Sequence, residues 1–400
     1  MLPINSLSSP QLPQPSTDAI EQSVLLQNKI INEINKNNGK ITFAEYMRLA
    51  LYAPGLGYYS AGSQKFGKSG DFVTAPEISP LFGYALAKQC QEIFLNSDVK
   101  SLFEIGAGTG ILAATLLIEL EKLNCLPDHY LILEISADLR QRQYETVLNK
   151  CPHLMSRMQW ISEWPNKPIN GIIIANEVLD AMPVHRFYLD NNVISEFYVI
   201  YENDQFNWSL QAPSSAELAI AIEHIKQTYL PQINNYATEI NLAMPSWIKQ
   251  LSDCLNHGVI LLMDYGFPSA EYYLADRNNG TLMCYYRHRA HDNPFLWPGL
   301  QDITAHVDFT RVAEAASNAG LSLSGYNSQA GFLLGCGVLD YFEQPINSMD
   351  NIDQFNLQQQ FKQLTLPSEM GEIIKVIGFT RDLNISLRGF SLQDRQYNLK

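Results

Sequence analysis

The sequence predicts an α/β fold, a doubly wound and mostly parallel sheet with helices on both faces. Three observations lead to this prediction. Short apolar runs recur between residues 101 and 263, these runs do not alternate with polar residues, and helical patterns separate them. Because a strand covered on both faces has no polar side, and because crossover helices join parallel strands, this order is typical of a doubly wound core.

A helical and loop extension precedes the core. Residues 1–19 are rich in Ser, Pro and Gln, so we expect a disordered lead. Residues 20–34 have the apolar spacing of a helix, and Thr42 opens the capping-box pattern Thr-Phe-Ala-Glu of a second one. A loop rich in Gly and Pro over residues 53–76 then leads to a third helix at 79–96.

The core elements follow in alternation. We expect strands that share a short apolar run at residues 101–105, 130–134, 158–161, 171–175 and 258–263. Helices should lie between the first of them at residues 111–123 and 136–149. The segment 370–378 is the candidate for a last strand at the edge of the sheet.

An insertion interrupts this core between residues 183 and 256. It should contain a β-meander, from alternating segments at 186–189, 194–200 and 206–210, and helices at 214–230 and 245–255. We interpret residues 268–310 as a long loop. The predicted regions are a disordered lead (1–19), a helical and lid region (20–97), a core (98–182 and 257–400) and an inserted subdomain that binds substrate or partner (183–256).

Composition and charge narrow the classes of partner. The 400 residues carry 27 Lys and Arg against 41 Asp and Glu, a net charge of −14. An acidic chain is a poor match for nucleic acid, whose binding depends on cations that neutralise phosphates, and it suits a cationic partner better.

Cysteine usage and the N-terminus predict a cytoplasmic protein. The six cysteines form no C-x-x-C pattern, so we expect reduced thiols. Residues 1–20 contain neither Lys nor Arg, unlike a signal or transit peptide. No apolar run approaches the roughly 20 residues of a membrane-spanning helix, so we expect no membrane insertion.

The most informative motif follows the first core strand. It places Glu104 ahead of Gly106, Gly108 and Gly110. Glycines at this position let a ligand approach the backbone at the N-terminus of the next helix. A dinucleotide-binding loop requires its third glycine at position 111, which is Ile111 here, and no Gly-Lys-Ser/Thr follows as in a P-loop.

A second acidic residue supports a ligand with a ribose. Glu134 ends the second core strand, where a carboxylate can bind both ribose hydroxyls. The glycine loop and this acid together resemble the class I S-adenosylmethionine (SAM) methyltransferases, whose fold is Rossmann-like. The alternatives are a nicotinamide or flavin dinucleotide and a glycine turn with a structural role. SAM fits best, because it has no pyrophosphate to hold.

Further motifs narrow the resemblance to one family. The chain is similar to the MidA family in segments spread over about residues 40–380, namely 43–47, 54–59, 70–79, 176–183, 263–266, 302–309 and 370–376. This resemblance implies a SAM-dependent methyltransferase that modifies arginine side chains of a partner protein. The mitochondrial member forms symmetric dimethylarginine and acts in the assembly of respiratory complex I.

An arginine acceptor indicates which residues are catalytic. The pKa of its guanidinium group lies above 12, so this group stays charged. Carboxylates must therefore hold it and orient one nitrogen. We expect Glu177 and Asp180, at the end of the fourth strand, to do so. The alternative is that Glu177 caps the next helix and Asp180 pairs locally. Asp302, His306 and Asp308 are further candidates that line the substrate cleft.

The remaining site residues should bind the cofactor. Ser162 and Glu163 follow the third strand, where adenine sits in this fold, and Trp164 either stacks on the base or packs in the core. Residues 60–76 should close over SAM as a lid, unless they form a turn network ahead of the third helix. The predicted SAM-binding set is Glu104, Gly106, Gly108, Gly110, Glu134, Ser162, Glu163, Asn176, Asp71, Thr74 and Glu77.

A metal site and two other functions are the alternatives. His288, His291, His306 and Asp308 are too loosely spaced for zinc, so we expect no metal. The chain could instead methylate a small amine or hydroxyl compound. It could also be a catalytically silent assembly factor, which the intact glycine loop and Glu134 argue against. The expected partner is a protein that presents an arginine, with a homodimer as the candidate assembly.

Overall fold

The computed structural model describes residues 12–60, 74–343 and 351–400, which belong to two compact units. The smaller unit comprises residues 1–72, 181–243 and 273–306, and the larger unit comprises 73–180, 244–272 and 307–400. This division differs from the predicted regions in three places. The helix Pro80–Leu95, predicted within the helical and lid region, groups with the core. The segment 273–306 groups with the insertion, and the helix at the end of the predicted insertion groups with the core.

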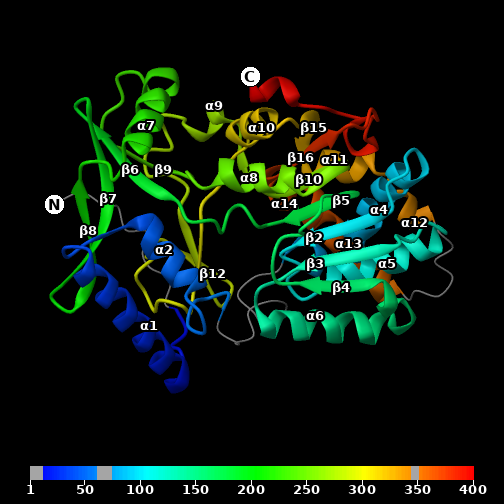
Figure 1. Cartoon of the computed structure of the whole chain (residues 1–400), viewed down its shortest axis with the longest axis horizontal. Helices are drawn as coiled ribbons and strands as arrows, with labels where there is room; N and C mark the ends of the chain where they lie inside the picture. Colours follow the sequence, from blue (N-terminus) through cyan, green and yellow to red (C-terminus); the bar gives the residue numbers. More distant parts are fainter. Residues whose placement is uncertain (1–11, 61–73, 344–350) are drawn as a thin grey trace. The chain divides into compact units, whose positions relative to one another are not determined.

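The larger unit contains the predicted parallel sheet (Figure 1). Its spatial order is β15 (Ser322–Ser328), β16 (Ile374–Arg381), β10 (Leu255–Phe267), β5 (Ile169–Asn176), β2 (Ser101–Ile105), β3 (His129–Leu133) and β4 (Met158–Ile161). Neighbouring strands from β10 to β4 are parallel, whereas β16 is antiparallel to β10 and β15. The short β14 (Val307–Asp308) pairs with the end of β10. All five predicted core strands are confirmed.

The order of these strands creates a topological switch point. From β2 the chain continues to β3 and β4 on one side, and it then crosses to β5 and β10 on the other side. The loops that follow β2 and β5 therefore leave in opposite directions, and open α/β sheets bind ligands in the crevice that results. The glycine loop follows β2, and Asn176 is the last residue of β5.

Helices pack on the sheet because its strands are apolar. Leu102, Ile172 and Ile174 share one buried cluster with residues of α4 (Pro80–Leu95) and α5 (Ile111–Lys122). The other helices of this unit are α3 (Ala75–Ile78), α6 (Ala137–Lys150), η1 (Pro152–Arg157), α8 (Met244–Asp253), α9 (Ser269–Tyr272), α10 (Phe309–Asn318), α11 (Gln329–Gly335), α12 (Asp340–Glu343), α13 (Asn351–Thr365), α14 (Met370–Ile373), η2 (Arg388–Phe390) and η3 (Gln396–Leu399). No helix in the described ranges is long and apolar enough to cross a membrane.

The connection from β4 to β5 is a loop. Residues 162–168, all of which the structure describes, contain no helix. Trp164 in this segment packs edge-on against Phe103 of β2 and Trp247 of α8, with ring centroids 6.4 and 6.2 Å apart. Trp164 therefore packs against the sheet, which is one of the two roles considered for it.

The smaller unit is built on antiparallel strands. The predicted meander is confirmed as β6 (His185–Asp190), β7 (Val193–Glu202) and β8 (Gln205–Gln211), and β9 (Tyr236–Ile240) and β1 (Ile41–Thr42) complete this sheet. A second sheet contains β11 (Met283–Tyr286), β12 (Arg289–His291) and β13 (Asp302–Thr304). The helices are α1 (Thr17–Lys36), α2 (Phe43–Tyr52) and α7 (Ala216–Tyr229).

Two sequence predictions were wrong. Residues 268–310 are not one loop, because they contain α9 and the strands β11 to β14. Strands of two to four residues are too short to show a periodic pattern. The segment 370–378 is not an edge strand either, since it begins with α14 and continues into β16, which lies inside the sheet. The edge strand is β15, whose Ser-Leu-Ser-Gly-Tyr-Asn-Ser sequence has too few apolar residues to predict it.

Candidate functional site

The glycine loop leaves open space beside its backbone. Gly108 and Gly110 have φ of +52° and +81°, in the left-handed region that favours glycine. A Cβ on Gly110 would lie 2.9 Å from Cα of Gln143, so helix packing requires this glycine. A Cβ on Gly108 would meet no described atom within 4 Å. The loop therefore borders a space that a ligand can occupy at Gly108.

Glu134 is tied to this loop through Gln143 of α6. The Glu134 carboxylate, 7% exposed, accepts hydrogen bonds from Ser136 N at 2.9 Å and from Gln143 Nε2 at 3.0 Å. Gln143 Nε2 also donates to the Gly108 carbonyl at 3.1 Å, and Gln143 Oε1 accepts from Trp160 Nε1 at 3.0 Å. Burial raises the pKa of Glu134, and these hydrogen bonds oppose the rise. The sequence analysis missed Gln143, because no motif contains it.

Glu104 lies beneath the loop. Its carboxylate is 3% exposed and accepts a hydrogen bond from the Tyr130 hydroxyl of β3 at 2.6 Å. Burial raises the pKa of Glu104 to about 7. Through this hydrogen bond Glu104 joins β2 to β3, and it thereby supports the glycine loop that follows β2.

The turn after β5 lies against the same loop. Glu177 has φ of +52°, and its backbone N donates to Met263 O of β10 at 2.8 Å. A Cβ on Gly106 would lie 2.9 Å from Cγ2 of Val178, so this turn and the glycine loop pack together. Asn176 Oδ1 is buried and has no hydrogen-bond partner among the residues that the structure describes. A buried acceptor of this kind is suited to a ligand that donates.

The short segment 74–78 connects the loop to this turn. The Thr109 hydroxyl donates to the Glu77 carboxylate. Ala75 N donates to Glu177 Oε1 at 3.4 Å, and the Asn176 side chain donates to the same oxygen at 3.3 Å. Thr74 lies at the start of α3. Of the predicted lid, residues 61–73, including Asp71, lie outside the described residues.

The predicted adenine residues line a cavity beside β4. Ser162 and Glu163 border a space of about 450 Å³ together with Trp160, Trp164 and Arg140. Within the described chain, the buried Nε of Arg140 has no hydrogen-bond partner. Glu134 N donates to Ile161 O at 3.0 Å, so this cavity adjoins the strand end that carries Glu134.

The other predicted catalytic residues have structural partners. Asp308 caps α10 through Arg311 N at 3.3 Å and accepts from Ser269 Oγ at 2.7 Å. Asp302 and His306 belong to the smaller unit, where Asp302 accepts from Tyr59 Oη at 2.7 Å and His306 N donates to Thr281 Oγ1 at 3.0 Å. Across the described ranges, no three His, Cys, Asp or Glu side chains are grouped to hold a metal ion.

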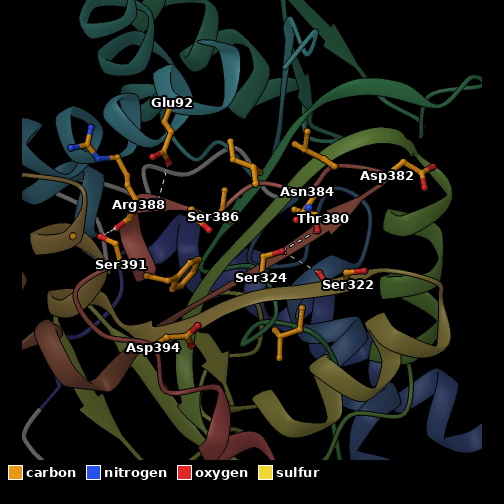
Figure 2. A pocket seen from close by; sticks show the side chains of 16 residues that line it. Glu92, Ser322, Ser324, Thr380, Asp382, Asn384, Ser386, Arg388, Ser391 and Asp394 are labelled. Carbon is orange, nitrogen blue, oxygen red and sulfur yellow. Dashed lines mark hydrogen bonds between the residues drawn. The ribbon is translucent and has the colours of Figure 1, made fainter. Parts of the chain in front are cut away.

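Figure 2 shows the side chains that line a second, larger cavity. It measures about 940 Å³ and is bordered mainly by hydroxyl and carboxyl side chains, among them Ser324 and Thr380. Thr380 pairs with Val259 near the start of β10, so this cavity lies at the amino ends of the parallel strands. Ligands of open α/β sheets bind at the carboxyl ends. We therefore place the candidate active site at the glycine loop, although the cavity beside β4 is smaller than the one at the amino ends.

The residues at the switch point fit SAM. Glu134 offers a carboxylate to the ribose hydroxyls, Asn176 Oδ1 offers a buried acceptor to the ammonium group, and Gly108 borders open space for the ligand. Asp264 of β10, which the sequence analysis did not single out as a site residue, accepts hydrogen bonds from the backbone of residues 178–180 at 2.8–3.3 Å. Its sequence signal was the Met-Asp-Tyr-Gly segment 263–266.

Comparisons with known proteins identify the family and its cofactor. A family model described as "Putative S-adenosyl-L-methionine-dependent methyltransferase" matches residues 85–327. A crystal structure from Burkholderia thailandensis with bound S-adenosyl-homocysteine is 40% identical, with a TM-score of 0.90 over 97% of this chain and 100% of that one. Protein arginine methyltransferase NDUFAF7 of Danio rerio is 27% identical over 89% of this chain and 86% of its own length. The human protein of that name is 28% identical over 84% and 79%.

These matches and the geometry agree on the cofactor and the reaction. The family match spans more than half of the chain, and the similar crystal structure holds the demethylated product of SAM. Both show a SAM-dependent methyltransferase. The chain belongs to the MidA family of SAM-dependent methyltransferases.

Proposed function

We propose that this methyltransferase transfers the methyl group of SAM to arginine side chains of a partner protein. The proposal rests on the carboxylates that lie beside the glycine loop. The names of the relatives from Danio rerio and Homo sapiens, which are protein arginine methyltransferases, support it. The net charge of −14 also favours a cationic acceptor.

The chemistry of the acceptor explains the need for carboxylates. Bound SAM supplies a methyl group on a sulfonium, and its transfer depends on alignment with the attacking nitrogen. A guanidinium group has a pKa above 12, so it stays protonated. Carboxylates hold it through charge-assisted hydrogen bonds, orient one nitrogen, and stabilise the positive charge during transfer. As the S–CH3 bond breaks and the N–CH3 bond forms, that nitrogen releases one proton through a carboxylate to solvent, so the products are S-adenosyl-homocysteine and a methylguanidinium with a single positive charge.

Glu177 is the observation that carries the proposal. Its Oε1 is fixed by Ala75 N and the Asn176 side chain, and the next residue, Val178, packs on Gly106 of the glycine loop. A carboxylate fixed this close to the loop is suited to hold an acceptor next to the methyl donor. Asp180, 7% exposed and three residues further along the chain, is the second carboxylate of the proposal.

Mass spectrometry of arginine methylation tests this function. In cells that lack the gene, methylated arginines of a client protein should disappear, and they should return with the wild-type gene. Symmetric dimethylarginine at these sites would extend the proposal to the product. Loss of methyl from a small amine or hydroxyl compound, with all arginines unchanged, would overturn it.

A variant of Glu177 tests the assigned role. Glu177→Gln keeps the shape of the side chain and removes its charge, so it should fail to restore methylarginine while it binds SAM within about threefold of wild type by calorimetry. Glu145→Gln, on the exposed face of α6, is the matched control and should restore methylation fully. Full activity of Glu177→Gln would assign the acceptor to another residue.

A further inference from the structure

A buried carboxylate lies next to the proposed acceptor site and does not face open space. Asp264 in β10 is 1% exposed. Its Oδ2 accepts hydrogen bonds from three consecutive backbone N–H groups, those of Val178 at 3.0 Å, Leu179 at 2.8 Å and Asp180 at 3.3 Å. Its Oδ1 accepts from Tyr265 N at 2.8 Å.

Three N–H groups that converge on one point form a site for an anion. In this protein the anion is a side chain from the neighbouring strand, because β10 and β5 are parallel and Met263 pairs with Asn176. Burial raises the pKa of Asp264 to about 7, and the four backbone hydrogen bonds oppose that rise. The carboxylate therefore binds the turn that follows β5 to the strand beside it.

This turn requires such support. Glu177 adopts φ of +52°, a conformation that is unfavourable for a residue with a side chain and that persists only where the surroundings fix it. Two contacts with β10 fix it: Glu177 N donates to Met263 O, and the three following N–H groups donate to Asp264. Without the Asp264 carboxylate, the second of these contacts is lost.

We propose that Asp264 is a positioning residue for methyl transfer, which fixes the turn 177–180 and so holds the carboxylates of Glu177 and Asp180 in the arrangement that binds the acceptor. This inference rests on the proposed function, since it takes these two carboxylates as the acceptor site. Asp264 acts through the turn and does not contact the reacting atoms.

Asp264→Asn tests this role against a purely structural one. The rate is measured as transfer from [methyl-³H]SAM into protein of a lysate from cells that lack the gene, and SAM affinity is measured by calorimetry. At saturating SAM the rate should fall at least about tenfold, while the dissociation constant for SAM stays within about threefold. Asp394→Asn is the control, because Asp394 also accepts two backbone N–H groups, from Tyr326 and Gln396, and should leave both values unchanged.

A double-mutant cycle with Glu177→Gln decides whether Asp264 acts through Glu177. If it does, the double variant should be no more than about threefold slower than Glu177→Gln alone. Fully multiplicative losses, an unchanged rate in Asp264→Asn, or equal losses of rate and SAM affinity would each overturn the inference. If Asp264→Asn does not fold, Asp264→Ser, which keeps one acceptor oxygen, enters the same cycle.

The labelled product separates this inference from the proposed function. Acid hydrolysis of the labelled protein shows which amino acid carries the methyl group. Label on a residue other than arginine would overturn the arginine proposal, yet the rates of the Asp264 and Glu177 variants would still decide the positioning role.

Discussion

Replacing Gly108 by alanine should weaken SAM binding more than it weakens the fold. Gly108 has φ of +52°, and an added Cβ meets no described atom within 4 Å. The cost to the free protein is therefore the left-handed backbone alone, about 1 kcal/mol. The same Cβ enters the space in which we place SAM. We expect the dissociation constant for SAM to rise at least about tenfold, which corresponds to about 1.4 kcal/mol.

Gly320→Ala is the matched control for this substitution. Gly320 belongs to the same unit, follows α10, and has φ of +80°. The nearest atom to its added Cβ is Arg381 Nη2 at 3.7 Å, an ordinary contact. This variant should lose the same stability in urea denaturation and bind SAM as wild type does in calorimetry. Wild-type SAM affinity in Gly108→Ala, with the stability loss of Gly320→Ala, would refute the placement of SAM against Gly108.

Three further predictions concern buried polar groups. Gln143→Met removes the amide that joins Gly108, Glu134 and Trp160, so it should cost about 2–3 kcal/mol in urea denaturation and weaken SAM binding; unchanged SAM affinity would show that Glu134 needs no such support. Burial raises the pKa of Glu104 from 4.5 to about 7, so ionisation opposes folding, and wild-type stability should fall by up to about 3 kcal/mol between pH 4.5 and 7. Glu104→Gln, which can still accept from Tyr130, should lose this part of the fall, and an equal fall in both proteins between pH 4.5 and 7 would contradict it. Arg186→Met should destabilise the smaller unit by about 3–5 kcal/mol, because it leaves the fully buried Glu239, whose Oε1 lies 3.4 Å from Arg186 Nε, without its cation. Adding Glu239→Gln should recover part of this loss, and no recovery would count against the pairing.

Local patterns of apolar residues were sufficient to predict most strands of the parallel sheet. The central strand β5 is a run of apolar residues buried on both faces at 172–175, whereas β3 and β4 are only partly buried, and each of these strands is recognisable from its own short apolar run. The sequence analysis missed the short strands β11 to β14 and the polar edge strand β15. These segments form strands because they pair with neighbouring strands, and their own residues show no periodic pattern.

At the site, sequence motifs locate the candidate residues, whereas their roles depend on contacts made in the folded protein. The glycine loop was predicted because positive φ at Gly108 and Gly110 demands glycine, and the structure has both in that conformation. Asp308 was a candidate for the substrate cleft, and the structure adds that its carboxylate caps α10. A carboxylate in a sequence motif does not reveal which donors surround it.

The sequence by itself determined the doubly wound sheet, the glycine loop and the acid at the end of β3, because each depends on residues that are neighbours along the chain. Only the tertiary structure decided that Gln143 joins Gly108 to Glu134 and that Asp264 binds the turn after Glu177. These contacts bridge 35 residues between Gln143 and Gly108 and 85 between Asp264 and Leu179. Because hydrogen bonds form wherever folding brings donor and acceptor together, no local pattern records them.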